Sequence, residues 1–450
     1  MYTEKNSLRT TLMKKFLDRY FSITDKNSTF KTEILAGLTT FITMAYIIFV
    51  NPSILEVSGI PKEAAIAATL WSAALCTLAM GLFAKLPYAV APGMGINAFF
   101  SFYVCKTVGL SWQTALGAVF ISGIVFLILT LTKLREKIID SVPLSLKSAI
   151  VVGIGMFIAF VGFQSSGIVA NSDATLVTLG HLSDPKVMLT LFGVAFIAVL
   201  LYLKVKAAML IGIIATAIIG MVFNITPAPT SVGDVVSFTI PSLKETFLEM
   251  DIVGAVKYGI VSIIFTFTVV ELFDNIGTLI GLSKSSGLMS FEGKIENVDK
   301  ALLTDSTGTM LSAALGTCTV TTYIESSSGI QAGGRTGLTA VTVAVCFLLS
   351  FIFTPLAAII PAFATAPVLI IVGALMLSHI KNIDFSDLSE VIPSFLIIIM
   401  MPLTYSIAIG FGMGFTCYCI MKIFSGKIRQ ISPVMWFVSI IFIISFINHG

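Results

Sequence analysis

Three acidic side chains stand within strongly apolar stretches of this sequence. Glu271 and Asp274 lie in I-I-F-T-F-T-V-V-E-L-F-D-N-I-G-T-L, and Glu325 lies in G-T-C-T-V-T-T-Y-I-E-S-S-S-G. An acidic residue at the centre of a membrane span costs about 2.5–3.5 kcal/mol, so three of them indicate a function. The spacing of three residues places Glu271 and Asp274 on one helix face. We expect these carboxylates to bind N–H groups of a substrate and to exchange a coupling proton.

Neighbouring polar and aromatic residues could complete a site, but each also has a structural interpretation. Glu271 or Asp274 could instead be a solvated or structural group at a cytoplasmic helix end. Asn97, at the end of A-P-G-M-G-I-N, could hydrogen-bond a substrate or cap the helix that follows. Tyr323 and Phe99 could stack on a planar ring, or they could pack in the protein core, as aromatic side chains commonly do.

The sequence contains no motif of a known catalytic centre. There is no H-E-x-x-H, no P-loop and no nucleophile elbow, so an enzyme is not indicated. His181 and His449 lie in a loop and at the terminus, and His379 is expected at a span end, facing the interface. Cys417 and Cys419 form C-x-C, but cysteines within apolar runs are better explained as small buried hydrophobic residues than as metal ligands. We expect no metal and no cofactor.

The elements that hold the acidic residues must be membrane spans. The chain has 450 residues, of which 56% are hydrophobic and 11% are charged, and its mean hydropathy is +0.99. A soluble protein carries about 25% charged residues, so lipid must cover most of this surface. The net charge of +3 gives no signal for nucleic-acid binding. Residues 1–32 are polar, with no apolar stretch before a cleavage site, and are expected to form a cytoplasmic tail.

Apolar runs long enough to cross a bilayer follow one another along the chain. A crossing helix needs about 20 apolar residues. Twelve spans are predicted, at 33–51, 64–84, 113–132, 147–164, 187–203, 207–223, 252–273, 299–316, 337–360, 366–380, 390–405 and 406–424. Two further stretches, 88–104 and 317–334, are apolar but interrupted by small and polar residues, and as broken helices they bring the total to fourteen. The short apolar tail 433–447 could lie in the interface or pack against the other helices.

The distribution of Lys and Arg supports this arrangement. With both termini in the cytoplasm, 22 of the 27 Lys and Arg residues lie inside, and the remaining five are Lys62, Lys106, Lys186, Lys244 and Lys257. This excess agrees with the positive-inside rule. Omitting either broken segment would place the loops between them on the wrong side, so both are counted as crossings. We predict a multi-pass protein of the cell (inner) membrane with cytoplasmic N- and C-termini.

The two broken segments are the third and the tenth of fourteen, which suggests an inverted repeat. Their separation is seven, and because seven is odd the two halves would have opposite orientations in the membrane. Unpaired amides in hydrocarbon are costly, so these segments belong in the protein interior, where the positive ends of their half-helices could face a substrate. The predicted fold class is an all-α polytopic membrane protein with a 7+7 inverted repeat and broken half-helices at segments 3 and 10.

Four motifs occur along the chain in a characteristic order. They are A-P-G-M-G-I-N-A-F-F (91–100), V-E-L-F-D-N-I-G-T-L (270–279), T-T-Y-I-E-S-S-S-G (321–329) and M-P-L-T-Y-S-I-A (401–408). In these motifs the chain resembles the AzgA-like branch of the nucleobase–cation symporter-2 family, and the likeness runs from about residue 30 to the end. Members of that branch are adenine, guanine and hypoxanthine permeases. The resemblance implies a purine nucleobase as substrate, symport with protons, and a homodimer.

The resemblance also implies two domains, each combining parts of both halves. A core domain holding the site would comprise 33–146 (segments 1–4) and 252–365 (segments 8–11). A gate domain would comprise 147–251 (segments 5–7) and 366–450 (segments 12–14 with the C-terminal tail), and it would build the homodimer. Transport would be elevator-like, with the core sliding against the gate.

Individual roles follow from the same resemblance. Other branches of the family carry E-x-x-G in segment 8, and when the motif is aligned on Gly277, Asp274 takes the place of that glutamate and Thr278 follows the glycine. An aspartate is commoner in the AzgA-like branch where this chain has Glu271, so the preferred purine stays open. Glu325 matches the glutamate of segment 10, and Tyr323 matches the aromatic residue two positions before it. The predicted substrate-binding residues are Asp274, Glu325, Asn97, Tyr323, Thr278, Phe99 and Ser326, and the predicted proton-coupling residues are Asp274, Glu325 and Glu271.

Other functions remain compatible with a polytopic membrane protein. A sulfate-type anion carrier, or a carrier of other small heterocycles, could use a similar fold, although two acidic residues beside the site would repel an anion. A membrane enzyme or receptor would need a nucleophile, metal cluster or cofactor motif that the sequence lacks. A channel for the same solutes would conduct only downhill and would be insensitive to an uncoupler. Sodium also stays open as the coupling ion, since carboxylates and unwound carbonyls can bind it.

Overall fold

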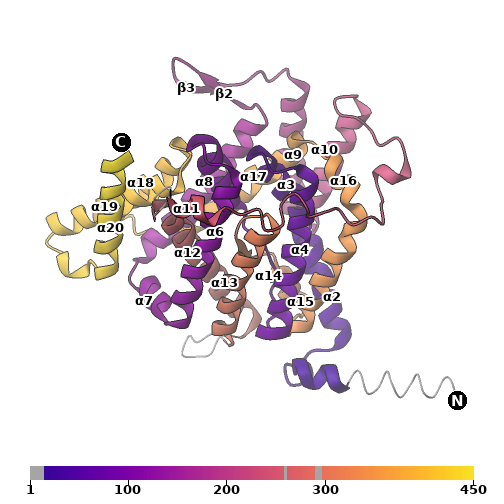
Figure 1. Cartoon of the computed structure of the whole chain (residues 1–450), viewed down its shortest axis with the longest axis horizontal. Helices are drawn as coiled ribbons and strands as arrows, with labels where there is room; N and C mark the ends of the chain where they lie inside the picture. The colour runs from indigo at the N-terminus through magenta and orange to yellow at the C-terminus, as the bar shows by residue number, and fades with distance from the viewer. Residues whose placement is uncertain (1–14, 258–260, 289–295, 450) are drawn as a thin grey trace.

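The computed structural model describes residues 15–257, 261–288 and 296–449, and these are mostly helical (Figure 1). Within them, nine helices are long and apolar enough to cross a membrane. Shorter apolar helices accompany them at Ala208–Val222, Leu388–Leu403 and Pro433–Ile444. Residues 1–14 of the predicted tail lie outside the described part. The first membrane helix begins at Phe30, where the Thr29 side chain caps it by accepting a hydrogen bond from the Thr32 N–H.

Most helices in the first half of the chain begin and end within three residues of the predicted spans. They are α2 (Phe30–Met44), α3 (Ile47–Val57), α4 (Lys62–Ala79) with its π-helical end η1 (Met80–Ala84), α6 (Trp112–Leu131), α8 (Leu144–Ser165), α9 (Pro185–Tyr202) and α10 (Ala208–Val222). A short helix, α7 (Leu134–Asp140), follows α6. The predicted span 33–51 differs, because a turn at Ala45 and Tyr46 divides it between α2 and α3.

In the second half, helices begin and end within four residues of the predicted spans, except at the first span. Its helices are α11 (Ile252–Lys257), α12 (Val261–Ser286), α13 (Val298–Leu315), α15 (Gly337–Leu349), η4 (Ser350–Phe353), α16 (Thr354–Ile359), α17 (Ala362–Met376), η5 (Leu377–Asn382), α18 (Leu388–Leu403), α19 (Ile407–Phe424) and α20 (Pro433–His449). The predicted span 252–273 is replaced by α11 and by α12, which continues well past 273. Hydropathy falls at the polar residues of α12, but Glu271 and Asn275 hydrogen-bond inside the protein, so the helix does not end there.

The two interrupted segments pair with each other as short strands, which the all-α prediction did not include. β1 (Val90–Pro92) runs antiparallel to β4 (Val320–Thr322), with Ala91 opposite Thr321. β1 leads into α5 (Met94–Ala98) and the π-helical η2 (Phe99–Thr107), and β4 leads into α14 (Ser326–Gln331). The strand pair satisfies backbone groups that would otherwise be unpaired in the membrane interior.

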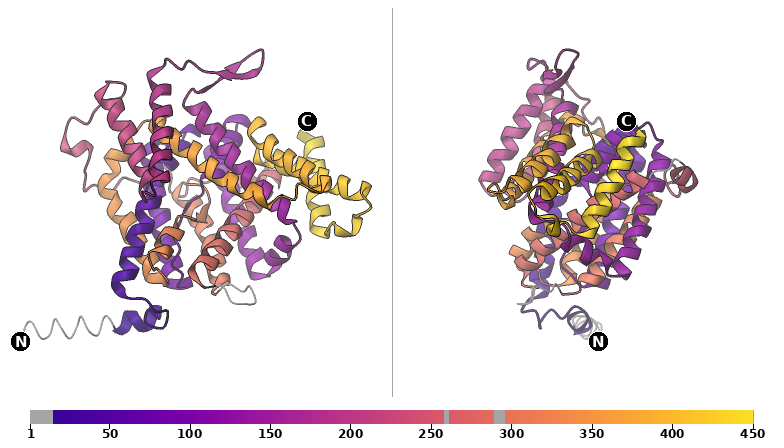
Figure 2. Two further views of the ribbon diagram at one scale, coloured as in Figure 1. Left: turned by 180° about the vertical axis from the view of Figure 1, so that it is seen from behind. Right: turned by 90° about the vertical axis from the view of Figure 1, so that its left-hand side faces the viewer.

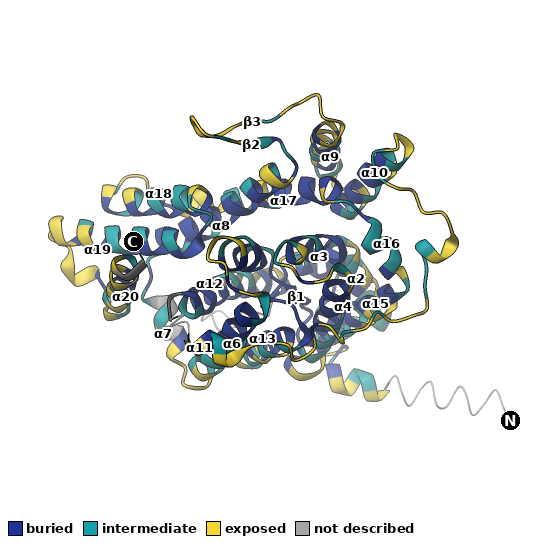
Figure 3. Ribbon diagram, turned by 45° about the horizontal axis from the view of Figure 1, so that its top comes forward, coloured by how far each residue is buried: buried dark blue, intermediate teal, exposed yellow. Residues whose placement is uncertain are grey.

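The helices form two groups that lie side by side (Figure 3). The central bundle surrounds β1 and β4 and contains α2–α6 and α12–α15; in it, α6 packs against α13, and α15 packs against α2 and α4. The flanking layer contains α8–α10 and α17–α19; in it, α8 packs against both α17 and α18. Each group takes corresponding elements from both halves of the chain, and the antiparallel pairing of β1 with β4 fits halves of opposite orientation.

Extramembrane features mark the two ends of the molecule. The hairpin of β2 (Val169–Ser172) and β3 (Leu176–Leu179) follows α8 and projects from the end opposite the N-terminus (Figure 2). A long connection with a single 3-10 turn, η3 (Val232–Asp234), links α10 to α11. The C-terminal helix α20 packs against α19 and α12, so the apolar tail 433–447 packs against the other helices.

Candidate functional site

A cavity of about 240 Å³ lies between the central bundle and the flanking layer. The central bundle contributes the two breaks, β1–α5 and β4–α14, together with Tyr46 and one face of α12. The flanking layer contributes the middle of α8 and the end of α17. Four of the predicted substrate-binding residues line this cavity, namely Asp274, Thr278, Tyr323 and Glu325. Segments up to 333 positions apart in the sequence, from Tyr46 to His379, therefore meet around one small space.

Two carboxylates face this cavity from different elements. Asp274 lies one turn before Thr278 on α12, and Glu325 precedes the first residue of α14. The two acids interact electrostatically with each other. The Tyr46 hydroxyl, at the turn between α2 and α3, donates a hydrogen bond of 2.5 Å to Glu325 Oε1. The arrangement offers acceptor oxygens to a ligand with N–H donors, and Tyr46 fixes the orientation of one carboxylate.

Two predicted residues hold the strand pair together. The Tyr323 hydroxyl donates to the Pro92 carbonyl oxygen at 2.5 Å, while other atoms of Tyr323 line the cavity. The Ser326 hydroxyl accepts a hydrogen bond of 3.0 Å from the Ala89 N–H and lies outside the cavity lining. Both side chains therefore connect the β1 segment to the β4 segment, which fixes the position of the two breaks.

Asn97 and Phe99 lie behind the cavity rather than at its wall. Asn97 is fully buried within α5, where Gly93 holds the N-cap position, so Asn97 does not cap the helix. Its amide donates to the Asn51 Oδ1 atom. Phe99 is also fully buried and stacks on Tyr103, with 5.2 Å between the ring centroids. The structure therefore places both side chains as supports of the third segment.

Glu271 belongs to a second buried cluster, which includes an acid that is not among the residues predicted from the sequence. Glu271 Oε1 accepts a hydrogen bond of 2.5 Å from Thr309 on α13, away from the cavity lining. On the same helix, the fully buried Asp305 accepts a hydrogen bond of 3.3 Å from the Thr322 hydroxyl on β4. Asp305 interacts electrostatically with Asp274, which connects the second cluster to the cavity. An acid within the predicted span 299–316 was the signal that could have identified Asp305.

Arg135 supplies the positive charge of this second cluster. It lies on α7, only 1% of its side chain is exposed, and its guanidinium lies 4.3 Å from the Phe126 ring centroid. It interacts electrostatically with both Asp305 and Glu271. Within the described part of the chain its nitrogen atoms have no hydrogen-bond partner. Hydropathy predicts that Arg135 lies in a cytoplasmic loop, because it does not show that α7 folds back and places the guanidinium inside the bundle.

His379 is not among the site residues predicted from the sequence, but it lines the cavity. It lies in η5, directly after α17, and it lines the cavity together with Met376. The expectation for His379 was an interfacial group at a span end. The structure agrees that it lies at the end of the span, but it also places His379 in the cavity lining, because η5 packs against α8.

A small cavity between two helix groups, each built from both halves of an inverted repeat, is the architecture of a membrane transporter. The chain belongs to the Permease family, whose model matches residues 31–413. It is therefore a multi-pass membrane permease and not an enzyme.

Similar proteins cover nearly the whole chain. A putative permease of Methanocaldococcus jannaschii, MJ0326, is 47% identical over 97% of this chain and 99% of its own length. The adenine permease AdeP of Escherichia coli is 41% identical over 96% of each chain. The guanine/hypoxanthine permease PbuG of Bacillus subtilis is 43% identical over 95% of this chain and 99% of its own length.

Solved structures with the same fold come from transporters of low sequence identity. The transmembrane domain of the cyanobacterial bicarbonate transporter BicA matches with a TM-score of 0.66 and 17% identity, over 84% of this chain and 96% of that one. SLC26A9 matches with a TM-score of 0.63 and 9% identity, over 93% of this chain and 70% of that one. At this identity the likeness concerns the fold alone. It confirms the predicted fold class, fourteen segments in a 7+7 inverted repeat.

Proposed function

We propose that this permease imports purine nucleobases together with protons. The observation that carries the proposal is the pair of carboxylates, Asp274 and Glu325, which face one small cavity from two different elements. The relatives AdeP and PbuG, named as adenine and guanine/hypoxanthine permeases, support the same substrate class. Adenine, guanine and hypoxanthine are the candidate substrates.

The chemistry of a purine matches this cavity. A purine is flat and neutral and carries donors and acceptors around its edge. Asp274 and Glu325 would accept its N–H groups, Thr278 would complete the polar edge, and Tyr323 would cover the ring. Asn97, Phe99 and Ser326, which lie outside the lining, would position the two broken segments.

Proton coupling follows from the charge of the same cavity. Two ionised carboxylates in a small, poorly solvated space repel each other, so loading one proton with the neutral substrate lowers that cost. Asp274 or Glu325 would carry the proton. Glu271, which interacts electrostatically with Asp274, would take part in coupling from the second cluster.

We further propose that the central bundle moves as an elevator against the flanking layer. The moving core would comprise 33–146 and 252–365, and the gate would comprise 147–251 and 366–450. The gate would also form a homodimer in the cell membrane.

The structure would represent a state open to the cytoplasm. With the N-terminus inside, α17 runs inward, and its cytoplasmic end and the following η5 supply Met376 and His379 to the cavity. On the external side, Tyr405 packs between Phe102 of the central bundle and Phe160 of α8, with ring centroids 6.0 Å and 5.4 Å away. These aromatic contacts would close the external route.

Uptake by cells lacking their own purine permeases tests the proposal. Labelled adenine, guanine and hypoxanthine are offered with and without a protonophore, with uracil as the control substrate. Accumulation of at least one purine, abolished by the protonophore and not accompanied by uracil uptake, is the expected result. Excess sulfate should not compete. Absence of purine uptake by a well-expressed, inserted protein would contradict the proposal, and competition by sulfate would favour an anion carrier.

Substitution of the two carboxylates tests the proton-coupling step. Asp274→Asn and Glu325→Gln keep the size of each side chain but remove its charge and its ability to release a proton. At least one of them should uncouple purine flux from pH, while Glu56→Gln, at an exposed position before the second span, should behave as wild type. Weakened binding with intact pH coupling in both variants would contradict the role of these residues as proton carriers.

A further inference from the structure

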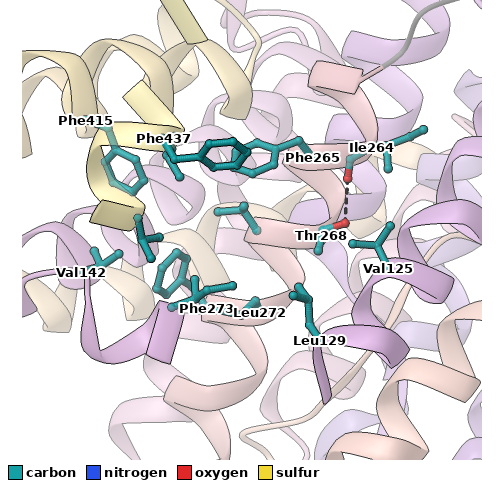
Figure 4. A pocket seen from close by; sticks show the side chains of 14 residues that line it. Val125, Leu129, Val142, Ile264, Phe265, Thr268, Leu272, Phe273, Phe415 and Phe437 are labelled. Atoms are coloured by element: carbon teal, nitrogen blue, oxygen red, sulfur yellow. Dashed lines mark hydrogen bonds between the residues drawn. The ribbon is translucent and has the colours of Figure 1, made fainter. Parts of the chain in front are cut away.

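A second and larger cavity, of about 380 Å³, lies where the central bundle meets the C-terminal helices (Figure 4). Its walls come from α6, α7 and α12 on one side and from α19 and α20 on the other. Phe265, Phe273, Phe415 and Phe437 contribute their aromatic rings. It shares no lining residue with the substrate cavity.

The lining of this second cavity is hydrocarbon. Of the 14 side chains drawn around it, only that of Thr268 carries a polar atom, and its hydroxyl is already bonded to the Ile264 carbonyl oxygen at 2.9 Å. A water molecule needs two to four polar partners, roughly, so water gains little in such a space, whereas apolar cavities of this kind bind hydrocarbon. Phe437 is 63% exposed, which opens the cavity toward the outer surface of the protein. In a membrane, the hydrocarbon at that surface is lipid.

Cationic residues lie close to the cavity lining along the chain, at α7 and at η6 (Ile428–Gln430). Lys137 directly precedes the lining residue Ile138, and Lys133 directly precedes the first residue of α7. The Ser432 hydroxyl donates to the Ser141 carbonyl oxygen at 3.1 Å, which brings Arg429 to the same edge. Lys133, Lys137 and Arg429, which we call the basic rim, are all exposed. A cluster of cations beside an apolar space matches the charge of an anionic lipid headgroup.

We propose that one acyl chain of an anionic phospholipid from the cytoplasmic leaflet occupies this cavity, with its headgroup on the basic rim. The orientation of the membrane is the proposed one, with α7 and η6 on the cytoplasmic side. Because α12 and α19 belong to the central bundle and the flanking layer respectively, the bound chain contacts both groups of helices. The lipid is thus a structural ligand at the surface between them.

Tryptophan quenching by lipids with brominated acyl chains tests this site. Trp71, Trp112 and Trp436 are replaced by Phe, and one tryptophan is introduced by Phe415→Trp in the cavity wall. The matched control is Phe347→Trp, at an equally buried position between α2 and α15. In vesicles of brominated phosphatidylglycerol, Phe415→Trp should lose most of its fluorescence and Phe347→Trp should not. Equal, weak quenching of the two would overturn the proposal.

The preference for an anionic headgroup provides a second test of the proposal. Brominated phosphatidylglycerol should quench Phe415→Trp at lower mole fraction than brominated phosphatidylcholine, and neutralising the basic rim (Lys133→Gln, Lys137→Gln, Arg429→Gln) should weaken phosphatidylglycerol binding by roughly fivefold for each cation. Equal quenching by both lipids would overturn the proposal.

Native mass spectrometry keeps the proposal testable if Phe415→Trp does not fold. The unmodified chain should retain about one phospholipid more than Val269→Phe, in which a larger side chain fills the cavity. Purine uptake by the same variants reports the proposed transport function separately. Equal lipid retention by the two chains would overturn the lipid site whether or not purine is transported.

Discussion

At the residue scale, the hydrogen bond between Tyr46 and Glu325 is the most specific contact of the candidate site. Residue 46 lies at the turn that divides the first span, and its hydroxyl reaches a carboxylate 279 positions away in sequence. Hydrogen bonds to charged groups contribute about 1.5–3 kcal/mol, so loss of this donor should leave Glu325 poorly oriented for a substrate.

Tyr46→Phe should therefore raise the KM for purine uptake by roughly tenfold or more, with expression unchanged. The matched control is Tyr88→Phe, because Tyr88 is also fully buried and hydrogen-bonded, but to Ser283 and Ser286 outside the cavity lining. Concentration-dependent uptake in the same cells measures both variants. Equal KM values for the two would show that the Tyr46 hydroxyl does not orient the site.

Arg135 provides the second prediction at this scale. Removing one member of a buried charge cluster costs about 3–5 kcal/mol, because the remaining charges lose their compensation. Arg135→Gln should lower the thermal midpoint of the detergent-purified protein, and adding Asp305→Asn should restore part of the loss. Lys204→Gln, at an exposed position between α9 and α10, serves as the control. A double variant no more stable than Arg135→Gln alone would mean that Arg135 does not compensate the acid.

At the scale of elements, glycines allow helices to approach closely at two kinds of contact. One kind lies within a single group of helices, and the other lies between the two groups. A Cβ atom at Gly373 on α17 would lie 2.3 Å from the Gly155 carbonyl oxygen on α8, inside the flanking layer. A Cβ atom at Gly95 on α5 would lie 2.5 Å from Ile154 Cγ2 on α8, across the boundary between the groups. The first contact holds a layer together, whereas the second lies at the proposed sliding surface.

Gly373→Ala and Gly95→Ala should consequently have different effects. Gly373→Ala should destabilise the fold by about 1–3 kcal/mol, because backbone on both helices must move apart. Gly95→Ala should slow purine transport but change the thermal midpoint less than Gly373→Ala does. Adding Ile154→Ala should restore the transport rate, because the smaller side chain leaves room for the new methyl group. Uptake rates and thermal midpoints of the three variants and the Gly95→Ala/Ile154→Ala double variant provide the measurement. Failure of Ile154→Ala to rescue would contradict a steric block between the groups.

At the scale of the whole molecule, the hairpin and the loop before α20 define opposite faces of the membrane. The proposed orientation places the β2–β3 hairpin outside and η6 inside. In a chain whose native cysteines are replaced, Ala174→Cys should react with a membrane-impermeant maleimide in intact cells. Arg429→Cys should react only after permeabilisation. The opposite labelling pattern would show that the topology is inverted. The cavity would then open to the external side and not to the cytoplasm.

Much of the membrane architecture could be predicted from the sequence, because hydropathy is a local property. Spans such as 113–132 and 187–203 required only about 20 apolar residues in succession, and the structure reproduces their ends within two residues. The two broken segments were also identifiable, because Gly, Pro and Ser interrupt them. Asp274 and Glu325 stood out for the same reason, as acids in apolar surroundings.

The arrangement of side chains around the site was decided only by the tertiary structure. The pairing of β1 with β4, the separation of Glu271 from the cavity and the inward position of Arg135 all depend on contacts between segments far apart in the chain. The pattern of apolar residues shows which segments enter the membrane but not which helix faces another, since lipid and protein neighbours are both apolar. Thus the sequence by itself determined most of the spans, their repeat and the three acids Glu271, Asp274 and Glu325, whereas packing decided which polar groups meet.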